Sequence, residues 1–386
     1  MNGNQWLFPA RVILNNETQS SDAATKIVKL PQSNYLHTLY VKVQCTNGAT
    51  SAKNQDISDV VDLVEVVANG SDVLLSLTPQ EIKRWVLWLT GANIPQVRNE
   101  RANAVQEMTF PLFFGRYPFD PNFYLRCSAL TDLELKITYS PTIAATSFAT
   151  GTTKIGVFAT MTMGAQPSDY LGTLTHKTIR AFTSAASGDD VTLIPRGNLL
   201  RQLLIFAYEA AVESATDITA IKFDVNNDEK VITNIGWNDL NNINKVTNWV
   251  VHEEEIFAFT ADTNTIDTDV ERITFVGSML QSAMADAGDT FELARITTIA
   301  GDRITVNQMA GDVTAGAETF ATDATSRNHL LQIKGQGLSH AVVLDFAQSG
   351  ESALLNTSTY DQVRLTLTQG GADALVRVSA QEVRSI

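Results

Sequence analysis

Apolar and polar residues alternate along most of the chain, at the spacing of two that is typical of a half-buried β-strand. Residues 26–46 form the first long example, in which Leu39, Val41 and Val43 are separated by more polar positions. Leu133–Thr138 repeats the alternation. Short strands with turn residues between them predict an all-β sandwich or jelly roll, and they disfavour an α/β fold.

One hairpin is marked by its turn. Two apolar-rich runs, Asp59–Val67 and Asp72–Leu77, lie on either side of Asn69-Gly70. Asn-Gly is a strong short-range hairpin signal, because both residues tolerate the positive φ angles that tight turns require. We therefore expect these two runs to pair as antiparallel strands.

A single well-defined helix is predicted over residues 79–90. Thr78 and Glu81 have the spacing of a capping box, Pro79 occupies the first helical position, and Gly91 provides the stop. Apolar residues recur at helical spacing: Ile82, Trp85, Val86 and Leu89. A weaker helix candidate lies near Leu240–Val250. We expect Trp85 to belong to the core.

The stretch Phe110–Leu125 contains seven aromatic residues and three prolines. Proline excludes a regular helix and disfavours a central strand. We therefore expect an irregular crossing segment held by aromatic burial, with structural roles for Pro118, Phe119 and Pro121. Arg116 could bind a partner phosphate, but its aromatic neighbours favour stacking or pairing within the fold.

Three similarities indicate an internal repeat. The segment beginning Leu30-Pro31 resembles the one beginning Ile194-Pro195, at an offset of 164 in the numbering. Trp85-Val86 matches Trp249-Val250 at the same offset. The strand from Leu133 resembles the strand from Val363, at an offset of 230. The repeat predicts one domain over residues 1–165 and a second over residues 166–386.

The difference between the offsets places extra chain at about residues 253–327, which we expect to form an accessory tower on the second domain. Strands are predicted at Arg272–Val276, Phe291–Ile299 and Arg303–Asn307, with turns at Ala300-Gly301-Asp302 and Gly311-Asp312. Its acidic residues could bind a cation between subunits, although such a run is more often a solvated loop. They are Asp262, Asp267, Asp269 and Glu271, and the run Glu253-Glu254-Glu255 has the same interpretation.

Composition narrows the function. The net charge of −14 disfavours direct nucleic-acid binding, which needs clustered Lys and Arg. Cys45 and Cys127 are expected to be buried thiols, and the scattered histidines lack zinc-site spacing. We find no phosphate loop, dinucleotide fingerprint or nucleophile elbow, so we predict a non-enzyme without a cofactor. No signal peptide is expected.

The capped helix, the segment Phe114–Pro121 and the strand Leu133–Thr138 together resemble the double jelly-roll major capsid proteins of tailless icosahedral viruses. The resemblance implies two tandem eight-stranded jelly rolls, each with a short helix, and a homotrimer that forms a pseudo-hexagonal capsomer. It further implies a location in the virion after assembly in the host cytoplasm. Neighbouring capsomers and penton or minor capsid proteins would be its partners, with an underlying membrane as a further possibility.

The alternative is a carbohydrate-binding or tail-spike-like β-protein. Such a protein needs exposed aromatic platforms and usually paired carboxylates in a groove. Trp85 and Trp88 would have to provide that platform, but both lie on the predicted helix, where packing is the commoner role.

Overall fold

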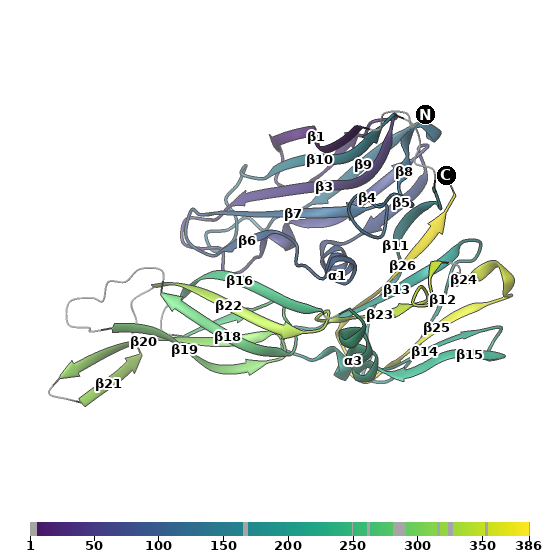
Figure 1. Cartoon of the computed structure of the whole chain (residues 1–386). Helices are drawn as coiled ribbons and strands as arrows, with labels where there is room; N and C mark the ends of the chain where they lie inside the picture. The colour runs from purple at the N-terminus through teal and green to yellow at the C-terminus, as the bar shows by residue number, and fades with distance from the viewer. Residues whose placement is uncertain are drawn as a thin grey trace.

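The computed structural model describes residues 6–385, except 165–168, 249, 261–262, 281–290, 315–316, 323–326 and 352–353. The first half of the chain forms two facing sheets of four main strands (Figure 1). One sheet has the order β1 (Trp6–Thr18), β10 (Lys154–Met163), β3 (Tyr35–Thr46) and β7 (Val105–Phe113). The other has the order β2 (Ala24–Lys29), β9 (Leu133–Tyr139), β4 (Val61–Ala68) and β5 (Asp72–Leu77).

The second half repeats this topology strand for strand. Its sheets have the orders β11 (Thr173–Thr183), β26 (Leu375–Arg384), β13 (Leu199–Tyr208), β23 (Ala341–Asp345), and β12 (Gly188–Leu193), β25 (Val363–Gln369), β14 (Ile218–Val225), β15 (Lys230–Gly236). Two sets of eight strands in this order are two tandem jelly rolls, which confirms the predicted fold class. We call them the first and second barrels. They are joined where β5 pairs in parallel with β11.

The repeat offsets coincide with element boundaries. β3 begins at Tyr35 and β13 at Leu199, which reproduces the first offset. β9 begins at Leu133 and β25 at Val363, which reproduces the second. The predicted match of Trp85-Val86 with Trp249-Val250 has no structural counterpart. Val86 lies within α1, whereas Val250 lies two positions beyond the end of α3, and Trp249 lies outside the described residues.

The two longer helices have equivalent places, each directly after one of the two equivalent strands β5 and β15. α1 (Pro79–Thr90) follows β5, and α3 (Trp237–Asn248) follows β15. The short elements are η1 (Ile57–Val60), η2 (Cys127–Ala129), α2 (Ser214–Asp217), η4 (Thr357–Thr359), β6 (Gln96–Asn99), β8 (Leu125–Arg126) and β24 (Leu355–Asn356).

An insertion between α3 and β23 accounts for the greater length of the second half. It contains β16 (Val251–Thr260), β17 (Thr263–Asp267), β18 (Ile273–Leu280), β19 (Phe291–Ala300), β20 (Arg303–Thr314), β21 (Ala317–Thr322) and β22 (Arg327–Gln336). It has its own apolar cluster, which includes Ile304 and Leu331. Its far end extends away from both barrels, and β16 pairs in parallel with β6 of the first barrel (Figure 1). The predicted turn at Gly311-Asp312 is wrong, because both residues lie within β20 and pair with β21.

The aromatic stretch is more regular than predicted at its start. Phe110–Phe113 belong to β7, and Pro111 pairs with Tyr40 of β3. The strand tolerates Pro111 because the short β6 pairs only with Met108 and Glu107, so at Pro111 strand pairing is limited to the β3 side. The irregular crossing begins after Phe113.

Each barrel encloses an apolar core, and the first core continues into the contact between the barrels. Leu204 and Phe206 of β13 pack in the same cluster as the first barrel's core and α1. Cys45 and Cys127 are free and buried, as predicted. Within the described residues, the helices are too short or too polar to cross a membrane.

Candidate functional site: the junction of the barrels and the insertion

Helix α1 lies between the two barrels (Figure 1). Its capping box is present: Thr78 Oγ1 accepts a hydrogen bond from the Glu81 amide, and Glu81 Oε2 accepts one from the Thr78 amide at 3.0 Å. Gly91 ends the helix in the left-handed conformation, with φ of 69°. Trp85 is 2% exposed, and its indole Nε1 donates to Ser379 Oγ of the second barrel at 3.0 Å. Trp85 and Trp88 are therefore buried packing residues and cannot serve as a ligand platform.

The Arg116 loop is a second contact between the barrels. The Arg116 guanidinium donates to both oxygens of the buried Asp120 carboxylate, at 2.7 and 2.9 Å, and lies 5.0 Å from the Phe123 ring centroid. Burial by itself would raise the pKa of Asp120, but hydrogen bonds from Arg116 and two backbone amides bring it below its usual value. Arg116 also lies 3.7 Å from Glu351 of the second barrel. Arg116 thus stacks and pairs within the fold.

The other residues of this loop that were predicted to have structural roles, Pro118, Phe119 and Pro121, lie in the turn itself. Phe119 adopts a positive φ of 63°, and its side chain is 39% exposed. Pro118 and Pro121 flank it in the turn that brings Asp120 back to Arg116. Beyond the turn, the Leu171 amide donates to the Asn122 carbonyl at 2.8 Å, so the loop rests on the chain that connects the two barrels.

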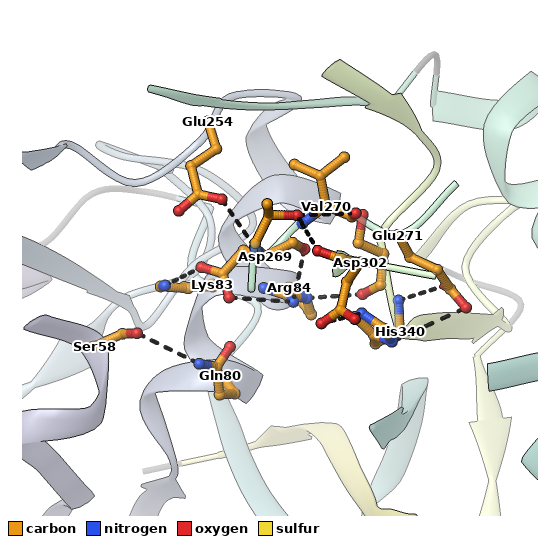
Figure 2. Close-up of polar contacts among 12 residues, drawn as sticks. Ser58, Gln80, Lys83, Arg84, Glu254, Asp269, Val270, Glu271, Asp302 and His340 are labelled. Carbon is orange, nitrogen blue, oxygen red and sulfur yellow. Dashed lines mark hydrogen bonds and ion pairs between the residues drawn. The ribbon is translucent and has the colours of Figure 1, made fainter. Parts of the chain in front are cut away.

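A buried network of charged side chains joins α1 to the insertion (Figure 2). Lys83 donates to the Asp269 carboxylate, and Arg84 Nε donates to the Ser339 carbonyl at 2.8 Å. Lys83 is 6% exposed and Arg84 is 1% exposed. Burial would raise the pKa of Asp269, but the neighbouring Lys83 and Arg84 hold it far below its ordinary value. Asp269 is therefore ionised, and it fixes the insertion to α1.

Arg98 of β6 extends the network. Its guanidinium lies 2.8 Å from Glu254 of β16, 3.1 Å from Asp56 and 3.6 Å from Glu100. It also donates to the Asp267 carbonyl at 2.8 Å. Burial opposes the charge on Arg98, but the carboxylates around it raise its pKa further above the usual value. A buried guanidinium that donates to several acceptors is held in one orientation, so Arg98 fixes the segments that it joins.

The insertion is also bonded to the second barrel. Glu271 accepts hydrogen bonds from the amides of Ser214 and His340, at 2.6 and 2.8 Å. Asp302 accepts one from the Ala211 amide at 2.7 Å, while its other oxygen lies 3.7 Å from His340 Nε2. Burial raises the pKa of Asp302 to about 6 and lowers the pKa of His340 to about 4. Burial thus opposes the charged form of both groups.

Several of the acidic residues singled out in the sequence form ion pairs. Asp267 is paired with Arg303, Asp269 with Lys83, and Asp262 lies outside the described residues. Glu254 is buried on Arg98, although Glu253 remains half-exposed beside Lys334. In the part of the chain that the structure describes, no group of three or more His, Cys, Asp or Glu residues could hold a metal.

Sequence reasoning missed the basic half of this network: Lys83, Arg84 and Arg98. The only signal was a pair of cations on the predicted helix, together with an unexplained acidic run in the insertion. Because Arg98 and Glu254 are 156 positions apart and Lys83 and Asp269 are 186 positions apart, spacing along the chain could not pair them. Chemically, the network holds three parts of the chain in fixed relation to one another.

Solved structures share this architecture over nearly the whole chain. The STIV MCP, from Sulfolobus Turreted Icosahedral Virus, has a TM-score of 0.56 at 11% identity, over 98% of this chain and 97% of that chain. The major capsid protein P2 from bacteriophage PM2 has a TM-score of 0.51 at 12% identity, over 99% and 98%. PBCV-1 VP54 has a TM-score of 0.55 at 10% identity, over 100% and 95%. The chain has the double jelly-roll fold that these proteins share. No protein-family model and no curated protein matches it.

Proposed function

We propose that this chain is the major capsid protein of an icosahedral virus and assembles into homotrimeric, pseudo-hexagonal capsomers. The observation that carries the proposal is the strand-for-strand repetition of one jelly roll within a fold shared with viral major capsid proteins. Three chains with two barrels each supply six similar units, which is the number needed for a hexagonal tile. Cyclic homo-oligomers of this kind are common because identical contacts close on themselves.

The buried charge network suits such a role. A shell subunit must keep the angle between its two barrels constant, since small rotations accumulate over many tiles. The contacts of Trp85, Arg116, Lys83 and Arg98 each join segments that are distant in sequence. The proposed role is therefore structural, and the chain would be found in the virion.

The proposal extends to partners that were expected from the sequence. Neighbouring capsomers are the direct ones, and penton or minor capsid proteins and an underlying membrane are further candidates. Trp6 belongs to β1 of the first barrel, where its backbone pairs with Met163. No specific observation favours the carbohydrate-binding alternative, because Trp85 and Trp88 are buried.

The mass of the purified protein tests the proposal. Light scattering should give three times the 42.1 kDa of a single chain, or larger particles, and negative-stain images should show hexagonal outlines. A chain that remains at 42.1 kDa at high concentration would contradict the proposal.

A further inference from the structure

The junction between the two barrels of one chain has two components. The first is the parallel pairing of β5 with β11, in which Leu75 lies opposite His176 and Ser76 opposite Lys177. The second is α1, whose Trp85 contacts the outer face of the second barrel through His176, 5.2 Å between ring centroids, and Ser379. Together they bury the edge of β5 and one face of the helix.

Each component has an equivalent elsewhere in the chain. β15 occupies the place of β5, and both pairings carry a bulge at the same point, Val66/Val67 in β4 and Phe223/Asp224 in β14. β1 occupies the place of β11. Their pairings with β10 and β26 share one bulge, at Val12/Leu14 and Thr178/Arg180, and the β1 pairing has two more, at Phe8/Arg11 and Leu14/Glu17.

The equivalence extends to single residues. α1 begins at Pro79 and α3 at Trp237, so Ile243 corresponds to Trp85 and Val246 to Trp88. On the strands, Val12 pairs with Phe158 as Thr178 pairs with Ser379. In the second barrel, Ile243 is therefore the structural equivalent of Trp85. In the first barrel, the Val12–Phe158 pair is the equivalent of the surface on which Trp85 packs.

These equivalents are uncovered in the single chain. β1 and β15 each end a sheet, and among the described strands each pairs on one side only. Val246 is 73% exposed, the most exposed large apolar side chain among the described residues, and Ile243 is 45% exposed. Val12 is 56% exposed. The buried residues of α1 therefore correspond to solvent-exposed apolar residues on α3. The strand pair that corresponds to the packing surface of Trp85 is also apolar.

We propose that β15 and α3 of one copy pack on β1 and β10 of a second copy, so that the contact between chains repeats the junction within each chain. β15 would pair in parallel with β1, with Asn234 opposite Arg11 as Ser76 is opposite Lys177. Ile243 and Val246 would cover Val12 and Phe158. This inference rests on the proposed function, because it names the surface by which the homotrimer forms.

A second copy is the occupant that the geometry favours. β1 lies on the first barrel and β15 on the second, well apart from it, so a chain cannot make this contact with itself (Figure 1). The two surfaces differ, which makes the contact head-to-tail, and head-to-tail contacts close into rings when the rotation is right.

Cross-linking tests the register. Neighbouring residues on paired strands lie within the Cα separation that a disulfide spans. The double variant Arg11→Cys/Asn234→Cys should therefore form covalent dimers and trimers under oxidation. The matched control Ser76→Cys/Lys177→Cys should link within one chain and keep the single-chain mass. Burial raises the pKa of the native thiols, to about 11 for Cys45 and about 12 for Cys127, so they should not react.

The outcomes separate the two proposals. Trimers that form by light scattering without inter-chain links in the Arg11/Asn234 variant would overturn this inference and leave the proposed function standing. A wild-type chain that stays monomeric would overturn both.

A single substitution provides a second measurement that does not depend on disulfide geometry. Val246→Asp should raise the protein concentration needed for assembly roughly tenfold or more, because it places a charge in a buried apolar contact. It should leave the monomer's circular dichroism unchanged, since Val246 is in solvent there. Leu193→Asp is the control: Leu193 is 59% exposed on β12, the opposite edge of the same sheet, and should not affect assembly. Equal assembly of Val246→Asp and wild type would refute the inference.

Discussion

Asp269→Asn should destabilise the protein far more than a surface substitution would. The change keeps the shape of the side chain but removes the negative charge that Lys83 and Arg84 share (Figure 2). Lys83 is 6% exposed and cannot recover its hydration without local opening. Breaking a buried pair by removing one partner costs about 3–5 kcal/mol, because the remaining charge is left uncompensated.

The assay is urea unfolding, followed by tryptophan fluorescence at fixed protein concentration, since assembly would otherwise change the apparent stability. Glu253→Gln is the matched control, because the Glu253–Lys334 pair joins two side chains that are 50% and 44% exposed in the same insertion. An exposed pair contributes about 0–1 kcal/mol. Adding Lys83→Met to Asp269→Asn should recover about 1–2 kcal/mol, because the stranded ammonium is then gone.

The pH dependence provides an independent check. A carboxyl whose folded pKa is depressed adds stability above its unfolded pKa, which for Asp269 is near 3.8, and that stability is lost as the pH falls. The difference between wild type and Asp269→Asn should therefore be constant near neutrality and narrow below about pH 4. Equal stability of Asp269→Asn and Glu253→Gln at pH 7 would refute the reasoning that this pair fixes the insertion to α1.

Single contacts lead to three further predictions. Thr78→Ala should cost about 1–2 kcal/mol in urea unfolding, because the Glu81 amide loses its capping acceptor; no change would argue against the capping box. Trp85→Ala should cost about 3–5 kcal/mol and Trp85→Phe clearly less, since Phe retains most of the packing and loses the bond to Ser379; equal costs would contradict this. Asp302→Asn should stabilise the protein by about 1–3 kcal/mol at pH 8 and hardly at all at pH 4. Because the folded pKa of Asp302 is raised to about 6, ionising its carboxyl between about pH 4 and 6 lowers the free energy of unfolding of the wild type, and the variant avoids this loss. Parallel pH profiles of wild type and variant would refute it.

Replacing residues 261–319 with a short Gly/Ser linker tests how far the two barrels depend on the insertion. This segment carries Asp269 and Asp302, and its loss would leave Lys83 and Arg84 buried without their partner. We expect the shortened chain to be destabilised unless Lys83 is also replaced by Met. Circular dichroism during thermal unfolding of the two shortened chains would compare them.

The sequence alone determined those features whose causes are local. The bounds of α1 follow from a cap, a proline, an apolar stripe and a glycine that all lie between Thr78 and Gly91, so no distant contact was needed to place them. Strand alternation and the two repeat offsets identified a duplicated all-β architecture, because the period of side chains is fixed by the backbone. The burial of both cysteines followed from their apolar surroundings.

Only the tertiary structure decided which charged residues are buried. A run of carboxylates looks the same in sequence whether it faces water or a guanidinium, and the partners of Glu254 and Asp269 lie 156 and 186 positions away. Pro111 shows the same limit, because its place in β7 depends on where the neighbouring β6 ends. Burying a charge is unfavourable unless an opposite charge meets it, and that meeting is a property of the fold and not of any local segment.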